Sequence, residues 1–167
     1  RIRAVDLDET PLPHESPLVY VERVASEKSA LCRASFDDGL PVLAADTTVV
    51  CDGQILGKPR DRTHGLAMLR QLSGRRHQVY SAVSLRNGHA HEQLVSISEV
   101  TFRTLNDDEI DAYWRTGEPA DKAGGYAIQG LASIFIASIN GSFSGVMGLP
   151  LFETAQLLAK QGIKVIA

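Results

Sequence analysis

One carboxylate occupies an unusual place in this sequence. Asp46 interrupts the apolar and β-branched run of residues 41–51, which is typical of a buried strand. An ionised carboxylate in such a strand is costly unless a cation or a hydrogen-bond donor compensates it. Asp46 could simply cap a neighbouring loop at the strand end. Alternatively, it could be a general base or a metal ligand held on a rigid element.

Two lysines lie where they could face an anion. Lys58 precedes Pro59, which restricts Lys58 to extended backbone and gives its side chain a defined direction. Lys28 follows Val24 by four residues and lies at the edge of the apolar face of a predicted helix. Either lysine could instead be an ordinary solvated side chain, with the stem of Lys28 covering apolar surface.

An acidic cluster near the start of the chain could hold a hard divalent cation. Glu9 follows Asp6 and Asp8, and carboxylate oxygens are the ligands that such cations prefer. Residues 6–10 also resemble the start of haloacid-dehalogenase-type phosphatases, in which Asp6 would be the nucleophile and Asp8 the acid.

That phosphatase mechanism also needs a second acidic pair at the end of a buried parallel strand. The only candidate pair, Asp107 and Asp108, follows Asn106 at the start of a predicted helix. The phosphatase pattern is therefore incomplete, and Glu9 could be either an ordinary loop carboxylate or part of a cation site.

The elements that must position these residues alternate between strands, hairpins and helices. Turn signals at residues 52–53 and 87–88 predict two β-hairpins. Together they indicate an α/β or α+β domain with a mixed, largely antiparallel twisted sheet flanked by helices. The predicted strands are residues 1–7, 41–51, 54–56, 78–85, 92–103, 133–139 and 163–166. The predicted helices are residues 17 to about 36–39, 61–72, 106–114 and 151–160.

Composition limits the class of protein. The 167 residues are enough for one domain, and 44% apolar with 22% charged residues is typical of a soluble globular protein. A net charge of −3 argues against a nucleic-acid or membrane surface. Two cysteines predict reduced thiols in the cytoplasm rather than a disulfide framework.

Short motifs spread along nearly the whole chain resemble the Maf family of nucleotide pyrophosphatases in sequence and in order. The motifs are Asp8-Glu9-Thr10, Glu27-Lys28, Ala45-Asp46-Thr47, Gly57-Lys58-Pro59-Arg60-Asp61, Leu72-Ser73-Gly74, Thr101-Phe102-Arg103, Ala123-Gly124-Gly125-Tyr126, Ile128-Gln129-Gly130, Asn140-Gly141-Ser142 and Gly148-Leu149-Pro150.

The resemblance implies a fold and a reaction. The fold is an elongated α/β domain related to inosine-triphosphate pyrophosphatases, here a single domain over residues 1–167, with a cleft between two lobes. Asp46 would be the catalytic proton acceptor, and Lys28 and Lys58 would face the triphosphate. Glu9 would hold a divalent cation, magnesium or manganese, together with Asp46. The products would be a nucleoside monophosphate and pyrophosphate.

The resemblance also implies a substrate and an assembly. Thr47 and Gln129 match positions linked to base choice, and their motifs are similar to those of the dTTP/UTP branch. The branch that acts on 7-methyl-GTP is the alternative. A homodimer that clears non-standard nucleotides from the pool is the expected form.

One family feature does not occur in these residues. Family members begin with a strand and a Ser-x-Ser-Pro-Arg-Arg loop that binds phosphate, whereas this sequence starts after that point. We therefore expect the chain to be N-terminally incomplete. A protein that truly lacked the loop would fit a second hypothesis, a non-catalytic nucleotide-binding regulator of cell division.

Overall fold

Five antiparallel strands form the sheet on which the other elements pack. The computed structural model describes residues 1–35 and 39–166, and its strand order is β2-β1-β3-β4-β5. Each strand pairing in the described residues is antiparallel, which confirms the predicted α/β fold with a largely antiparallel sheet. The parallel pairs that a mixed sheet would contain do not occur among these residues. The strands are β1 (Val42–Cys51), β2 (Gln54–Leu56), β3 (Arg76–Asn87), β4 (Ala90–Phe102) and β5 (Ile136–Asn140).

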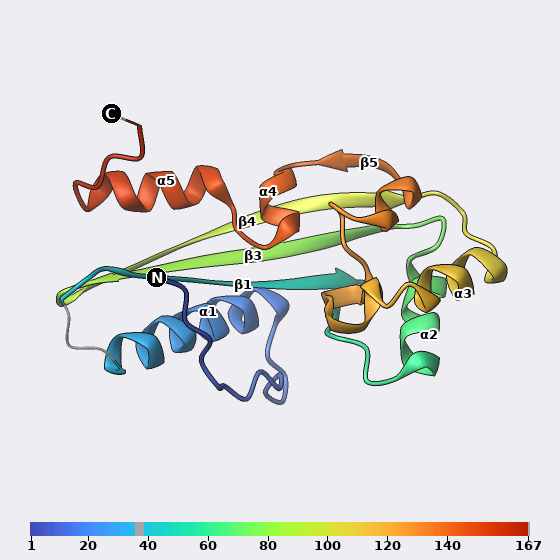
Figure 1. Ribbon diagram of the computed structural model, residues 1–167, viewed down its shortest axis with the longest axis horizontal. Coiled ribbons are helices and arrows are strands. Elements are labelled where there is room, and N and C mark those ends of the chain that lie inside the picture. The colour runs from blue at the N-terminus through green and yellow to red at the C-terminus, as the bar shows by residue number, and fades with distance from the viewer. Residues whose placement is uncertain (36–38, 167) are drawn as a thin grey trace.

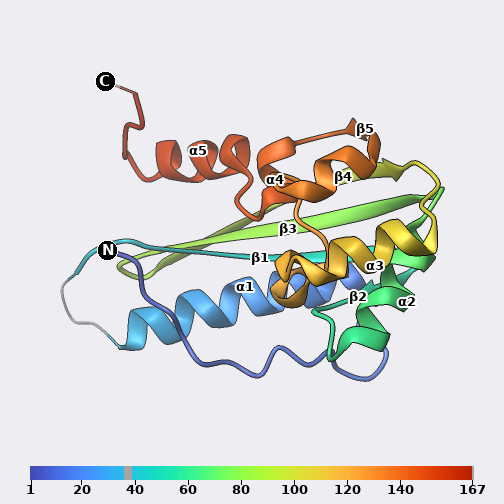
Figure 2. The same ribbon diagram turned by 45° about the vertical axis from the view of Figure 1, so that its right-hand side comes forward.

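Helices cover both faces of this sheet. In Figure 1, α1 lies below the strands and α4 and α5 lie above them, whereas α2 and α3 lie together at one end. Figure 2 shows the same grouping after rotation. The helices are α1 (Pro17–Ala34), α2 (Arg62–Leu72), α3 (Asp107–Arg115), α4 (Phe143–Met147) and α5 (Leu151–Lys160), with 3₁₀ turns η1 (Glu118–Asp121), η2 (Ala123–Gly125) and η3 (Leu131–Phe135).

Local sequence explains where the main helices begin. Ser16 accepts a hydrogen bond from the backbone N–H of Val19, and Pro17 takes the first helical position of α1. At α3, the side chains of Asn106 and Glu109 each accept a hydrogen bond from the other's backbone, as the sequence predicts. These caps satisfy N–H groups that have no partner within the helix.

The alternation of β3 side chains assigns each helix to a face of the sheet. Ala82 packs against α1 in a cluster with Val21 and Val24. Its neighbour Val83 packs on the opposite face against Leu157 of α5. The two faces therefore have separate apolar cores.

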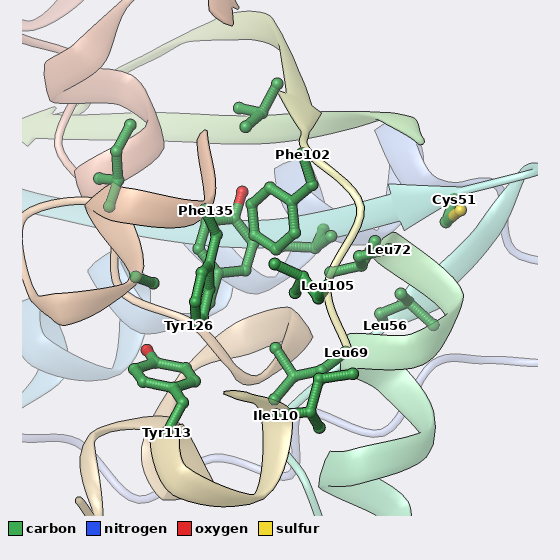
Figure 3. Close-up of a cluster of buried hydrophobic side chains, with 14 of the residues drawn as sticks. Cys51, Leu56, Leu69, Leu72, Phe102, Leu105, Ile110, Tyr113, Tyr126 and Phe135 are labelled. Carbon is green, nitrogen blue, oxygen red and sulfur yellow. The ribbon is translucent and has the colours of Figure 1, made fainter. Parts of the chain in front are cut away.

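The larger core lies on the same face as Val83, toward α2 and α3. Figure 3 shows the rings of Phe102, Tyr126 and Phe135 lying side by side, in the same buried cluster as Leu69 and Leu72 of α2. The ring centroids of Phe102 and Tyr126 are 4.8 Å apart in an edge-to-face contact. This core fixes the segment that carries Tyr126 against the sheet.

Two predicted strands are wrong. Residues 1–7 form no strand: Ile2 is 99% exposed, and only Leu7 packs against a core cluster. Residues 163–166 are irregular, with Val165 and Ile166 exposed. An apolar run needs a sheet edge and a core to become a strand, and neither segment has both.

Other boundaries differ by a few residues. The predicted strand 133–139 begins only at Ile136 because η3 precedes it, and α4 was not predicted. Helix α1 ends at Ala34, where Ser35 N–H bonds to Leu31 O. The predicted end of that helix at Phe36-Asp37-Asp38 lies outside the described residues. Within residues 1–35 and 39–166, no helix has the length and apolar character needed to cross a membrane.

Glu118 holds the irregular segment between α3 and β5 together. Its carboxylate accepts hydrogen bonds from the Tyr113 hydroxyl at 2.7 Å, from Leu131 N–H at 2.9 Å and from Ala132 N–H at 3.3 Å. Glu118 thus accepts hydrogen bonds from the first two backbone N–H groups of η3, which would otherwise need partners in a strand. This explains why the chain turns there instead of continuing as a strand.

We expect Glu118→Ala to lower the free energy of unfolding by about 2 kcal/mol, because three donors lose a charged acceptor. Urea denaturation checks the value. Glu99→Ala is the matched control, since Glu99 makes only a 3.3 Å surface ion pair with Arg76, and such pairs contribute little. Equal losses in the two variants would contradict the assigned role of Glu118.

Candidate active site

A cavity of about 320 Å³ lies at the edge of β1. Strand β2 pairs with β1 only at Val49–Cys51, so the described residues leave that side of the preceding part of β1 without a strand partner. The cavity lies at this open edge, and residues from both faces of the sheet line it. Its lining includes every residue that the sequence predicted for the site: Glu9, Lys28, Asp46, Thr47, Lys58 and Gln129.

A lysine joins the two predicted carboxylates. The Nζ atom of Lys28 lies 2.7 Å from Asp46 Oδ1 and 2.8 Å from Glu9 Oε1. Lys28 comes from α1 and Asp46 from the middle of β1, whereas Glu9 comes from the N-terminal loop. The side chain of Lys28 therefore does not merely extend into water; it is the ionic partner of Asp46.

Burial changes the protonation of this pair. The Asp46 side chain is only 7% exposed, and its Oδ2 atom has no hydrogen-bond partner among the described residues. Desolvation raises the pKa of Asp46, and the hydrogen bond from Lys28 opposes that rise. Burial alone would favour the neutral amine of Lys28, but Asp46 and Glu9 outweigh it and raise the pKa of Lys28. Lys28 therefore stays charged beside a carboxylate of increased basicity.

Lys58 brings a second cation to the cavity. Its side chain is 63% exposed, and its Nζ atom lies 3.9 Å from Glu9 Oε2. The preceding residue is tied down, because Gly57 O accepts a hydrogen bond from Gly124 N–H at 3.0 Å. Gly124 has φ +68°, and a Cβ there would lie within about 3 Å of the Val49 side chain. Only glycine allows this close approach to β1.

The two residues predicted for base choice lie at different parts of the cavity. Thr47 follows Asp46 in β1, and its Oγ1 lies 2.7 Å from Ser81 Oγ. Gln129 is an exposed residue in the turn just before η3, the turn that Glu118 anchors. Both side chains line the cavity, although nothing joins them directly in the described contacts.

Residues that the sequence reasoning missed also line the cavity. Lys122 adds a third cation, with its Nζ atom 2.9 Å from Asp121 Oδ1. Tyr126 lines the wall, and its buried hydroxyl lies 2.8 Å from His77 Nε2. The motif Ala123-Gly124-Gly125-Tyr126, which directly follows Lys122, contributed to the family resemblance, but neither Lys122 nor Tyr126 was assigned a role from the sequence.

The described carboxylates suit a metal ion only in part. The described portion of the chain contains no group of three or more His, Cys, Asp or Glu side chains that could hold one. Glu9 and Asp46 nevertheless supply two carboxylates, and Asp46 Oδ2 lacks a partner. Mg²⁺ commonly binds through one or two carboxylates plus substrate phosphates and water. The pair therefore fits a cation that enters together with a phosphorylated substrate.

The fold and the cavity define an α/β protein with a buried carboxylate among cations, an arrangement suited to phosphate chemistry. The chain belongs to the Maf-like protein family, whose model matches residues 1–161. This match confirms the resemblance found in the sequence.

Similar proteins carry a consistent name. A protein of Methylococcus capsulatus named "dTTP/UTP pyrophosphatase" is 56% identical over 162 residues, which cover 97% of this chain and 80% of the relative. Proteins with the same name from Nitrosomonas europaea and Aromatoleum aromaticum are each 54% identical, and 81% of each is covered. The two alignments cover 98% and 97% of this chain, respectively.

Proposed function

We propose that this protein hydrolyses dTTP and UTP to nucleoside monophosphate and pyrophosphate. The observation that carries the proposal is Asp46, a buried carboxylate with a partner-free oxygen in a cavity lined by lysines. The name shared by relatives at 54–56% identity supports the choice of substrate. We further propose a cytoplasmic homodimer with a role in clearing unwanted nucleotides, as the family resemblance implies.

The chemistry follows from the charges around Asp46. Asp46 accepts a proton from a water molecule, and the resulting hydroxide attacks the α-phosphorus of the triphosphate. The bond from the α-phosphorus to the bridging oxygen breaks, and pyrophosphate leaves. The raised pKa makes Asp46 a stronger base than an ordinary aspartate, and Lys28 still favours its ionised form.

The lysines act on the substrate. The transition state of phosphoryl transfer spreads negative charge over the phosphate oxygens, so fixed cations lower its energy. Lys28 and Lys58 stabilise the departing pyrophosphate, and Lys122 is placed to bind the same anion. Glu9 keeps Lys28 and Lys58 oriented toward one region.

Glu9 and Asp46 would also hold a magnesium or manganese ion, which supplies further charge neutralisation to the phosphates. Because Lys28 lies between these carboxylates, the protein must accommodate two cations at one carboxylate pair. Asp46 Oδ2 makes no hydrogen bond with the described residues but is itself buried, so neighbouring side chains would have to move before a cation or a water molecule could reach it.

The products test this proposal. The protein is incubated with dTTP, UTP, CTP, 7-methyl-GTP and ITP in magnesium or manganese. We expect pyrophosphate and monophosphate in equal amounts from dTTP and UTP. Release of inorganic phosphate would exclude the mechanism, and preference for 7-methyl-GTP would reassign the substrate. Binding without cleavage of any nucleotide would favour a regulatory protein.

A further inference from the structure

A buried serine lies directly beneath Thr47. Ser81 of β3 is the register partner of Thr47 in the β1–β3 ladder, and its side chain is 1% exposed. Ser81 Oγ lies 2.7 Å from Thr47 Oγ1 and donates to the carbonyl oxygen of Gly145 in α4 at 2.6 Å. The three groups form a chain of hydrogen bonds from the cavity wall to α4.

The direction of every bond in this chain is fixed by counting protons. A hydroxyl has one proton to donate, and a carbonyl oxygen can only accept. Because the proton of Ser81 goes to Gly145 O, Ser81 Oγ can only accept from Thr47. Burial keeps solvent from providing Ser81 with another acceptor. The proton of Thr47 is therefore engaged with Ser81, and Thr47 Oγ1 presents only lone pairs to other groups.

The free side of Thr47 Oγ1 opens into the cavity. Gly148 lines the same cavity, and a Cβ built on it would lie 3.7 Å from Thr47 Oγ1. The absence of a side chain at Gly148 leaves room beside the hydroxyl. A ligand in the cavity can therefore reach the lone pairs of Thr47.

We infer that Ser81 is a specificity-determining residue that fixes the Thr47 hydroxyl as a hydrogen-bond acceptor for a ring N–H of the base. This inference rests on the proposed pyrophosphatase function, including the part in base choice that the family resemblance implies for Thr47, and names how the substrate is chosen. Uracil and thymine carry a proton on N3 and can donate to Thr47. Cytosine has an unprotonated N3, so its lone pair would face the lone pairs of Thr47.

Without Ser81, Thr47 would discriminate poorly between uracil and cytosine. A freely rotating hydroxyl donates to cytosine N3 as readily as it accepts from uracil N3–H. With Ser81 present, Thr47 can donate to cytosine only by breaking its bond to Ser81. A site built to pair with a substrate N–H strongly rejects an analogue that lacks it, because polar groups are left unpaired.

The test compares Ser81→Ala with Ser98→Ala in the full-length protein. Ser98 is equally buried and bonds to the backbone of Ser142 next to α4, but it does not touch Thr47. The measurement is kcat/KM for UTP divided by kcat/KM for CTP. We expect the ratio to fall by about tenfold or more in Ser81→Ala. Ser98→Ala is expected to keep the wild-type ratio.

Two further measurements keep the inference testable if Ser81→Ala folds poorly. Ser81→Thr retains the hydroxyl and is expected to retain the ratio. With the wild-type protein, 3-methyl-UTP lacks the N3 proton and is expected to be cleaved at least about tenfold less efficiently than UTP. Efficient cleavage of 3-methyl-UTP would overturn the inference.

The outcomes separate this inference from the proposed function. A wild-type enzyme that releases pyrophosphate equally well from UTP and CTP keeps its function but overturns the role of Ser81. An unchanged ratio in Ser81→Ala does the same. A protein that cleaves no pyrimidine triphosphate overturns the proposed function itself, and the base selection with it.

Discussion

An Asp46→Asn variant of the full-length protein is expected to hydrolyse UTP with a kcat about a hundredfold or more below that of the wild type. The amide keeps the shape of the side chain and can still accept a hydrogen bond from Lys28, but it cannot take a proton from water. Steady-state pyrophosphate release at saturating UTP measures the effect. Asp107→Asn is the matched control, because Asp107 pairs with Arg70 on the surface outside the cavity.

The same variant should not lose stability. Burial raises the pKa of Asp46, so this group stabilises the fold when protonated, and that contribution is lost as pH rises through its folded-state pKa. Ionised Asp46 is therefore unfavourable for folding at neutral pH. We expect the Tm of Asp46→Asn to equal or exceed that of the wild type at pH 8, with a smaller difference at pH 4.

For the kinetic prediction, a kcat of Asp46→Asn within threefold of the wild-type value would contradict the role of Asp46.

A Lys28→Met variant is expected to lose roughly a hundredfold in kcat/KM for UTP, because it removes a charge-assisted bond to Asp46 and a cation for the phosphates. Loss of the ammonium also removes the group that lowers the pKa of Asp46, so that pKa should rise further. Asp46 would then be protonated over a wider range. The acid limb of the kcat/KM profile should move to higher pH.

Profiles of kcat/KM between pH 5 and 9 test this shift. Lys28→Arg retains the charge with a different geometry and should fall between wild type and Lys28→Met. Lys160→Met is the control for removing a lysine, because Lys160 pairs with Glu92 outside the cavity. A uniform loss of rate without movement of the acid limb would show that Lys28 does not set the ionisation of Asp46.

The residues of the site could be predicted from the sequence, but the contacts between them could not. Asp46 stood out because a charge in an apolar strand demands compensation, and the order of motifs indicated the family. Nothing in the sequence spacing, however, shows that Lys28 bonds to Asp46, since that contact depends on how α1 packs on β1. Ser81 gave no signal, because its role arises only from the register of β1 and β3.

The fold was predictable where local chemistry and packing agree. Both predicted hairpins form, the first at its expected turn, residues 52–53, and the second at residues 88–89, one residue later than the predicted 87–88, because Asn87 still pairs with Ala90. Segment 163–166 was mispredicted because β-branched composition says nothing about whether a sheet edge is available. The turn at η3 depends on Glu118, a contact across thirteen residues that no local pattern reveals.

Asp46 and Thr47 are consecutive residues on opposite faces of one strand, and the cavity reaches both around the open edge of β1. Asp46 shares its face with α1, whereas Thr47 shares the other with Ser81 and α4. The roles proposed for Asp46, proton acceptance, and for Thr47, base choice, thus depend on separate packing environments, although the two residues are adjacent in the chain. Under the proposed function, substitutions near α4 would therefore change the choice of base while the packing that holds Asp46 beside α1 stays unaltered.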